Sequence, residues 1–239
     1  TRDPLELVRS FQIPTDDPAY VRTLNFSWTY DSAVAAAGFI AAGDQAQGER
    51  LLDQLAALQR TDGSVDSAFD VSSGGGSGEF TSGTIAWVGL ADVTHDRTFS
   101  STRYDTSARL AADYLLKLQL DNGLIRGGPT VEWASTLHNL VAYAFIGELG
   151  DLLTARGDSA GAAYTAAAKR IAAGIDANLI VRDADGVHFT QGLGDTAKAL
   201  DVQALGAVYL LGRGARDDAV AVRAYAQKYF AVTDRSITT

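Results

Sequence analysis

The sequence contains neither cysteine nor methionine in its 239 residues. Without cysteine, the chain has no disulfide bond, no thiolate metal site and no cysteine nucleophile. Because methionine is absent, Thr1 is not expected to be the residue at which translation starts, so we expect a processed chain or an internal piece of a longer one. No signal peptide is visible, and a removed one would leave no trace. The lack of cysteine weakly favours an extracytoplasmic or secreted protein and also fits the cytoplasm.

Positive charge is scarce as well. The chain has 20 Lys and Arg residues against 29 Asp and Glu, for a net charge of -9. Binding to a phosphate backbone requires a clustered basic surface, so we expect no nucleic acid partner. The acidic balance suits a neutral or cationic partner, or simply solubility. The most apolar stretches carry Asp, Glu or Arg within about 18 residues, so no membrane span is expected.

The remaining composition is typical of a globular protein. Hydrophobic residues make up 46% of the chain and charged residues 21%. A chain of this length buries a sizeable core. We therefore interpret residues 1–239 as a single domain.

An internal repeat organises the chain. The pattern Leu55-x-x-Leu58-Gln59-x-x-Asp62-Gly63 recurs as Leu115-x-x-Leu118-Gln119-x-x-Asn122-Gly123, and a weaker third copy ends at Asp185-Gly186. In each copy a helical pattern runs into Asp-Gly or Asn-Gly, followed by an apolar residue. The glycine supplies the positive φ that closes a helix or makes a turn.

Between these marks the apolar residues follow a helical period. Helices that are apolar almost all round alternate with amphipathic ones, which predicts buried and half-exposed partners. Eight helices are expected, forming four hairpins, at 30–42, 50–59, 84–93, 106–119, 137–153, 160–179, 199–211 and 217–230.

This alternation predicts an all-α fold of two concentric helix layers. Repeated hairpins of about 60 residues are typical of α/α toroids and of some solenoids. We therefore expect an α/α toroid that is incomplete at its C-terminus, because four hairpins are fewer than the roughly five to seven that a closed ring needs. Long connections at 64–82, 124–134 and 187–197 follow the outer helices, so they should share the rim where the inner helices begin. Sites are often built from such loops on a rigid scaffold.

The starts of the expected inner helices carry residues suited to a sugar site. Aromatic faces stack on pyranose rings, and a pair of carboxylates supplies an acid with a base or nucleophile. The candidate catalytic residues are Asp31, Glu132, His138 and Asp201. The candidate substrate-binding residues are Trp28, Tyr30, Trp87, Trp133, Asn139 and Gln203.

Each candidate also has a structural interpretation. Asp31, like Asp195, is suited to capping a helix. Glu132 is placed to cap a helix or to pair with Arg126, and His138 could be a satisfied core residue. The tryptophans, taken singly, fit a core position. Asp201 is the strongest functional candidate, because a carboxylate inside an apolar helix is costly unless it is paired or faces water.

Other site classes find no support in the sequence. The run from Gly74 to Gly78 is a flexible loop tip without the Lys-Ser/Thr of a phosphate-binding loop. His95, His138 and His188 show no metal-ligand spacing, and no nucleophile elbow is present. We therefore expect no metal and no cofactor. A terpene-cyclase-like or prenyltransferase-like toroid would need acidic metal clusters, an acid-bearing Asp motif or a zinc site, none of which is evident.

Several motifs together resemble a bacterial group of six-hairpin (α/α)6 toroid proteins related to glycoside hydrolases. They are Ser27-Trp28-Thr29-Tyr30-Asp31-Ser32-Ala33, the helix-end Leu-Gln-x-x-Asp-Gly, Ser135-Thr136-Leu137-His138-Asn139-x-x-x-Tyr143 and Leu200-Asp201-Val202-Gln203-x-x-Gly206-Ala207. The resemblance spans roughly residues 10–215. It implies a site at the rim where the inner helices begin, with Asp31, Glu132, His138, Asn139 and Asp201 at matching positions.

The chain also departs from the resemblance at two positions. Leu137 and Val141 stand where the family leads us to expect Glu and Asp. Two functions therefore stay open. The first is a carbohydrate-active, glycoside-hydrolase-like domain acting on a poly- or oligosaccharide. The second is a catalytically degenerate toroid that binds carbohydrate or serves as a module of a larger assembly, with another protein chain covering or completing the ring.

Overall fold

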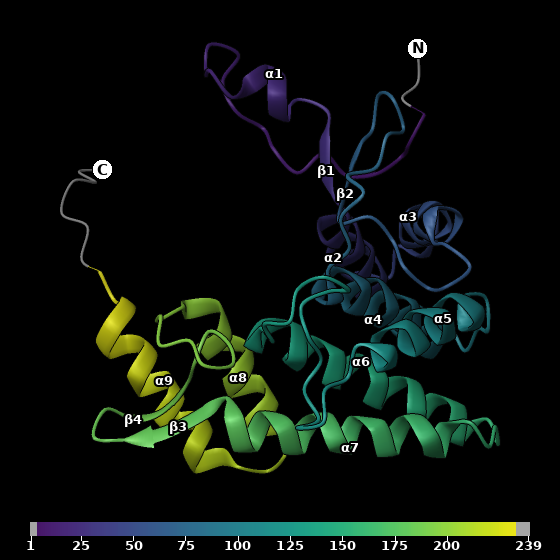
Figure 1. Cartoon of the computed structure of the whole chain (residues 1–239). Helices are drawn as coiled ribbons and strands as arrows, with labels where there is room; N and C mark the ends of the chain where they lie inside the picture. The colour runs from purple at the N-terminus through teal and green to yellow at the C-terminus, as the bar shows by residue number, and fades with distance from the viewer. Residues whose placement is uncertain (1–3, 233–239) are drawn as a thin grey trace.

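A computed structural model describes residues 4–232 and shows a mostly helical chain (Figure 1). Four helical hairpins follow one another along it, which confirms the predicted all-helical repeat. A short helix precedes them, and four short strands lie in the connections. The elements are α1 (Tyr20–Thr23), β1 (Phe26–Trp28), α2 (Thr29–Ala41), α3 (Gln45–Leu58), β2 (Ala68–Asp70), α4 (Ser82–Thr98), α5 (Asp105–Lys117), α6 (Thr136–Ala155), α7 (Gly161–Asn178), β3 (Ile180–Asp183), β4 (Gly186–Phe189), α8 (Leu200–Gly212) and α9 (Arg216–Phe230).

The first helices of the hairpins, α2, α4, α6 and α8, form the inner layer. Each contacts the next one along the chain, and α4 and α6 are buried along most of their length. Small residues allow this close approach. A Cβ atom at Gly89 would lie 2.1 Å from Cζ of Phe145, and one at Gly206 would lie 2.3 Å from the Phe189 ring. The glycines therefore let large apolar rings fill the space between neighbouring hairpins.

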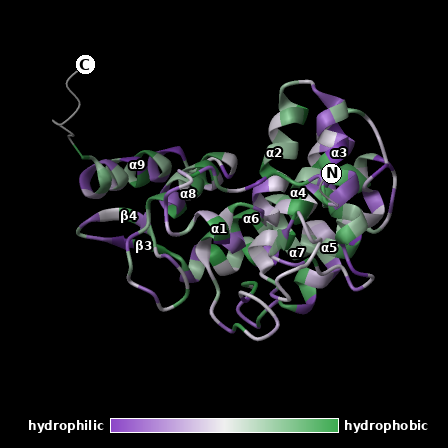
Figure 2. Cartoon of the chain, turned by 90° about the horizontal axis from the view of Figure 1, so that it is seen from above, coloured by the Kyte–Doolittle hydropathy of each residue, from purple (hydrophilic) through white to green (hydrophobic). Residues whose placement is uncertain are grey.

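The second helices of the hairpins, α3, α5, α7 and α9, form the outer layer. Their hydrophobic residues lie on one face, as in α3, where Leu51, Leu52 and Leu55 are fully buried. The opposite face is polar, and Figure 2 shows both characters on α3 and α9. This is the amphipathic pattern that the sequence predicts for a helix with one side in water.

In the first two copies of the repeat, the structure shows why the turn contains a glycine. Gly63 and Gly123 have φ values of +94° and +88°, a region that favours glycine. A Cβ at Gly63 would lie 1.9 Å from the carbonyl oxygen of Leu110 in the next outer helix. Nε2 of Gln119 donates a 2.9 Å hydrogen bond to the carbonyl oxygen of Gly123, and Gln59 makes the corresponding bond to Gly63. The motif therefore fixes the turn against the following hairpin.

The connections also contain strands that the helical reading did not predict. β1 pairs antiparallel with β2, with Ser27 opposite Phe69. β3 pairs antiparallel with β4 through a turn at Gly186, so the third copy of the repeat is a β-hairpin rather than a helix-end turn. The connection that the sequence predicted at 187–197 therefore begins within strand β4 rather than as a loop. Both ribbons are small, and the fold class stays all-helical.

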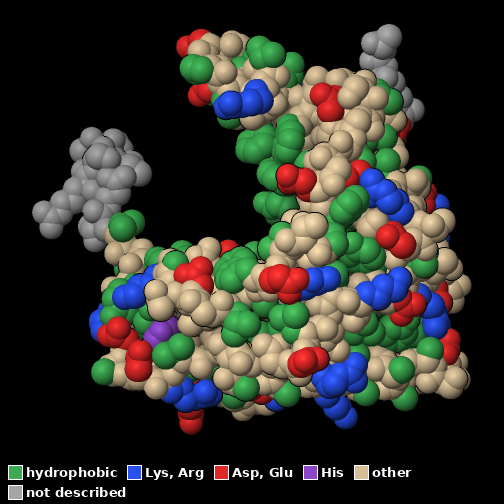
Figure 3. All heavy atoms as spheres, viewed as in Figure 1, with side chains coloured by type: hydrophobic (Ala, Val, Ile, Leu, Met, Phe, Trp, Pro, Cys, Tyr) green, Lys and Arg blue, Asp and Glu red, His purple; other side chains and the backbone are tan. Residues whose placement is uncertain are grey.

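The four hairpins curve into an open arc rather than a closed ring (Figure 1). The segment with α1 and β1 rises from one end of the arc, and α8 and α9 form the other end. Figure 3 shows a wide hollow between them, with hydrophobic side chains gathered on its wall. Within residues 4–232, no helix has both the length and the apolar character needed to cross a membrane.

Candidate functional site

The long connections return to the starts of the inner helices. The backbone N–H of Thr29 donates to the carbonyl of Ser67 at 3.0 Å, and the N–H of Ser82 donates to that of Gly127 at 2.9 Å. In the third hairpin, Thr136 donates to Gln191 at 3.0 Å. Each connection thus satisfies an orphan donor of its own inner helix. The structure places all three connections on the rim that the sequence predicts.

A cavity of about 630 Å³ opens at this rim. Its size is within the range of small-molecule sites. Side chains from all four inner helices line it, together with residues of the connection before α4. The lining residues are Trp28, Tyr30, Val34, Ser67, Glu79, Thr81, Gly83, Thr84, Trp87, Leu137, His138, Val141 and Asp201.

Three of the predicted aromatic residues lie in this cavity. Trp28 ends β1 and Tyr30 is the second residue of α2, and their ring centroids are 6.5 Å apart. The Phe26 ring packs edge-on against the Trp28 ring, with the two ring centroids 5.0 Å apart. The Tyr30 side chain is exposed, and Trp87 of α4 is half-buried. Amphipathic rings in a concave surface suit the apolar faces of a sugar.

Two carboxylates line the cavity, and the sequence analysis named only one of them. Asp201 lies in the first turn of α8, where its Oδ1 accepts a hydrogen bond from the N–H of Val202 at 2.9 Å. Glu79 lies in the connection before α4, two residues ahead of the Thr81 cap of that helix. Its nearness to an inner-helix start could have marked it as a rim residue. A two-carboxylate arrangement is one that glycoside hydrolysis can use.

Other predicted residues lie outside this cavity. Asp31 is in the first turn of α2 but is not part of the lining. Glu132 is highly exposed, at 74%, and pairs with Arg126, which is one of the structural roles considered for it. Trp133 is partly exposed and covers Gly192, where a Cβ would lie 2.2 Å from its ring. Catalysis by Asp31 or Glu132 and sugar binding by Trp133 stay predictions.

Asn139 and Gln203 share one structural role behind the cavity. The Asn139 side chain accepts from the N–H of Ile125 at 2.7 Å and donates to its carbonyl at 2.9 Å. Gln203 does the same with Phe189, at 2.9 and 2.7 Å. Both amides are buried. They clamp the connection of the preceding hairpin to the next inner helix, and substrate binding by them stays a prediction.

His138 is held in a fixed position by two neighbours. Its Nδ1 lies 3.0 Å from Oγ of Ser82, and its ring covers Gly83, where a Cβ would lie 2.3 Å from Cδ2. Burial lowers the pKa of His138 to about 4, so the ring is neutral at pH 7. The Ser82 hydroxyl is fully buried, and within residues 4–232 it contacts Nδ1 of His138, so we infer that its proton is donated to Nδ1. Nε2 then carries the ring proton and is a hydrogen-bond donor rather than a base.

The two positions where the family resemblance leads us to expect acids also line the cavity. Leu137 and Val141 lie on α6 on either side of His138 in the lining. Both side chains are apolar, so this wall supplies no carboxylate. Among the described residues, the charged side chains that line the cavity are therefore Glu79 and Asp201, with no Lys or Arg beside them.

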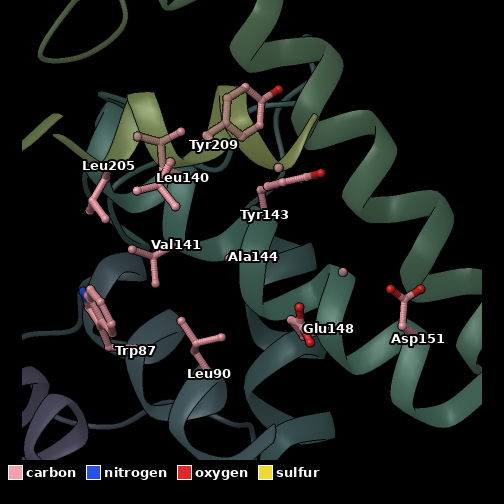
Figure 4. Close-up of a pocket in the computed structure, with 13 residues that line it drawn as sticks. Trp87, Leu90, Leu140, Val141, Tyr143, Ala144, Glu148, Asp151, Leu205 and Tyr209 are labelled. Carbon is pink, nitrogen blue, oxygen red and sulfur yellow. The ribbon is translucent and has the colours of Figure 1, made fainter. Parts of the chain in front are cut away.

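A second cavity of about 530 Å³ adjoins the first, because Trp87 and Val141 line both. Figure 4 shows Trp87 and Leu90 of α4 and Val141 of α6 turned toward this space. Its wall is mainly apolar, with Glu148 and Asp151 at one side. The inner faces of α4, α6 and α8 thus continue the candidate site along the hollow of the arc. Within the described residues, no cluster of three His, Asp or Glu side chains is suited to hold a metal.

Comparison with known proteins gives matches among solved structures. No family model and no curated protein matches the chain. A wild-type glycosidase structure has a TM-score of 0.69 at 19% identity, covering 87% of this chain and 62% of that one. A sugar epimerase from a ruminal bacterium has a TM-score of 0.69 at 14% identity, covering 88% and 61%. An unsaturated glucuronyl hydrolase from Bacillus sp. GL1 has a TM-score of 0.64 at 14% identity, covering 95% and 64%.

This chain therefore spans less than two thirds of the length of these structures. At these identities the similarity concerns the fold. This similarity of fold agrees with the hairpin repeat and the two helix layers described above. The chain has an α/α toroid fold, which these solved structures share.

Proposed function

We propose that the rim cavity is a saccharide site of a carbohydrate-active protein. The observation that carries this proposal is the convergence of Trp28, Tyr30 and Trp87 with two carboxylates in one cavity. Rings offer stacking surfaces, while the carboxylates accept hydrogen bonds from sugar hydroxyls. The Nε2–H of His138 adds a donor for a sugar oxygen. The fold is shared with glycosidases, one of which is described as a complex with glucose.

Within this proposal, Glu79 and Asp201 are the carboxylates for acid and base, or acid and nucleophile. Glycosidic hydrolysis needs such a pair about 5–10 Å apart on either side of the bond. The two residues come from separate elements, the connection before α4 and the start of α8. A saccharide lying on the aromatic rings would pass between those elements. Neutral His138 would position the sugar and would not exchange a proton.

Binding is tested by titrating the chain with neutral and basic oligosaccharides while tryptophan fluorescence is recorded. We expect a saturable change for at least one saccharide, which Trp28→Ala and Trp87→Ala weaken by about tenfold or more, a loss of about 1.4 kcal/mol. Trp133→Ala is the matched control, because Trp133 lies outside the cavity lining. If no saccharide binds, or if only Trp133→Ala weakens binding, the proposal is wrong.

A second candidate function is binding without hydrolysis. Leu137 and Val141 favour it, because they leave the α6 wall of the cavity without the acids of the resembling family. The two functions are separated by following release of reducing ends from a bound saccharide. Turnover that Asp201→Asn and Glu79→Gln abolish while binding persists supports hydrolysis. Tight binding with no turnover supports the binding module.

A further inference from the structure

The cavity carries charge of one sign only. Glu79 and Asp201 line it, while Lys and Arg are absent from its wall. No ion pair between described residues involves either carboxylate. Some other carboxylates of the chain do form ion pairs, as Asp53 does with Arg103 at 2.7 Å and Asp176 with Arg213 at 3.0 Å. Two negative groups in one cavity thus lack a positive partner from the described chain.

The rest of the wall favours a cation too. Trp28, Tyr30 and Trp87 present ring faces, whose negative quadrupole attracts ammonium groups. His138 is neutral at pH 7 and adds no positive charge. A low-dielectric wall of Val34, Leu137 and Val141 strengthens the field of the carboxylates within the cavity. Among the described lining residues, no positively charged side chain would pair with an anionic group.

We propose that the cavity selects saccharides that carry a protonated amine and disfavours those that carry a carboxylate. This proposal rests on the proposed function, because it assumes that the cavity binds a saccharide. The amine would lie between Glu79 and Asp201, while the pyranose ring stacks on the aromatic side chains. A uronic acid at the same place would meet two like charges with no Lys or Arg to compensate them.

The test compares four β-1,4-linked trisaccharides of matched size by isothermal titration calorimetry at pH 6. Their units are glucosamine, glucose, N-acetylglucosamine and glucuronic acid. At this pH the carboxylate of the glucuronic acid trimer is ionised and the amines of the glucosamine trimer are protonated. We expect the glucosamine trimer to bind at least about tenfold more tightly than the glucose and N-acetylglucosamine trimers, and the glucuronic acid trimer to bind most weakly. High salt should narrow these differences, because it screens charge.

Isosteric variants locate the source of the preference. Asp201→Asn and Glu79→Gln should each reduce the preference of the glucosamine trimer over the glucose trimer, and the double variant should abolish it. Asp121→Asn removes one negative charge from an exposed turn outside the cavity, so it should leave the preference unchanged. Circular dichroism establishes that each variant is folded.

The outcomes separate this inference from the proposed function. If the glucose trimer binds as tightly as the glucosamine trimer, the site binds saccharides but the charge selection is wrong. The selection is also wrong if the glucuronic acid trimer binds at least as well, or if the double variant keeps the preference. If none of the four trimers binds, both the proposed saccharide site and the proposed charge selection are wrong.

Discussion

At the residue scale, neighbouring positions of one helix serve different purposes. His138 lines the cavity, whereas the next residue, Asn139, clamps Ile125 behind it. On α8, Asp201 likewise lines the cavity, whereas Gln203 clamps Phe189 behind it. An α-helix turns through about 100° per residue, so adjacent side chains point to different surroundings. The sequence indicated that these residues lie at inner-helix starts but left the direction of each side chain open.

Glu79 is the carboxylate of the cavity that no pattern in the sequence singled out. It follows a glycine-rich run and carries no motif of its own. It lines the cavity because the connection crosses the rim, where the N–H of Ser67 donates to the carbonyl of Glu79 at 2.8 Å. Such a contact between distant parts of a loop depends on the folded path of the backbone. No periodicity in the sequence encodes that path.

The low pKa of His138 predicts a pH dependence of stability. Its pKa is about 4 in the folded chain and about 6.5 when unfolded, so the unfolded state binds the proton first as pH falls. The free energy of unfolding should fall between about pH 6.5 and pH 4, by up to about 3 kcal/mol from this group. Urea unfolding of the wild type and of His138→Gln across this range isolates the contribution. Equal pH slopes in the two proteins would contradict it.

A second prediction concerns the space beneath His138. In Gly83→Ala, the new Cβ would lie 2.3 Å from Cδ2 of the His138 ring, so the ring must move from its place over α4. The Nε2–H donor would move with it, and saccharide affinity should fall by about tenfold with a destabilisation of about 1–3 kcal/mol. Calorimetric titration and urea unfolding measure the two effects. Gly38→Ala, on α2 with nothing within 4 Å of its added Cβ, is the matched control and should keep full affinity.

At the element scale, the helices were predictable and the strands were not. Long segments alternate between apolar and amphipathic character, and that alternation reflects burial directly. The strands have only three or four residues each. β1 and β2 pair across the whole first hairpin, so their pairing depends on how α2 and α3 pack. In β4, the apolar–polar–apolar pattern covers only Val187, His188 and Phe189. A run of this length is too short to distinguish a strand from a loop in the sequence.

The repeated glycine turns should differ in their tolerance of substitution. All three glycines have positive φ, so each change to alanine carries a backbone cost of about 1–2 kcal/mol. At Gly63 and Gly123 the Cβ would also meet backbone oxygens, at 1.9 and 2.3 Å, whereas at Gly186 nothing lies within 4 Å. We expect Gly63→Ala and Gly123→Ala to cost more than about 3 kcal/mol in total, and Gly186→Ala to stay near the backbone cost. Thermal unfolding of the three variants gives the order, and a uniform cost would refute the close-packing argument.

The amide clamps lead to another prediction at this scale. Asn139→Ala would leave the buried N–H and carbonyl of Ile125 without partners, and Gln203→Ala would do the same at Phe189. Each change should cost about 1–3 kcal/mol per unsatisfied group. Asn139→Asp keeps the acceptor for Ile125 N–H but loses the donors, so it should not restore stability. Chemical denaturation measures these costs, and wild-type stability in Asn139→Ala would show that the clamp is dispensable.

At the scale of the whole molecule, the arc leaves inner-helix and edge surface open to water. Val208, Leu211 and Val220 of α8 and α9 are 63%, 55% and 60% exposed. Along the rest of the arc, the face of each inner helix that looks toward the next hairpin is covered by that hairpin. Among the described residues, nothing covers this face of α8.

This exposed edge predicts self-association of the chain in solution. Apolar surface of this kind favours contact between copies, while the net charge of -9 opposes it through repulsion. Salt screens the repulsion and strengthens apolar contact, so association should increase with ionic strength. Sedimentation velocity over a concentration series at low and high salt measures this, with Leu211→Lys and Val220→Lys expected to return the chain to monomer. Replacing Val21, which is 87% exposed on α1 far from this edge, by Lys should have no such effect. A chain that stays monomeric at every concentration and salt level would contradict this prediction.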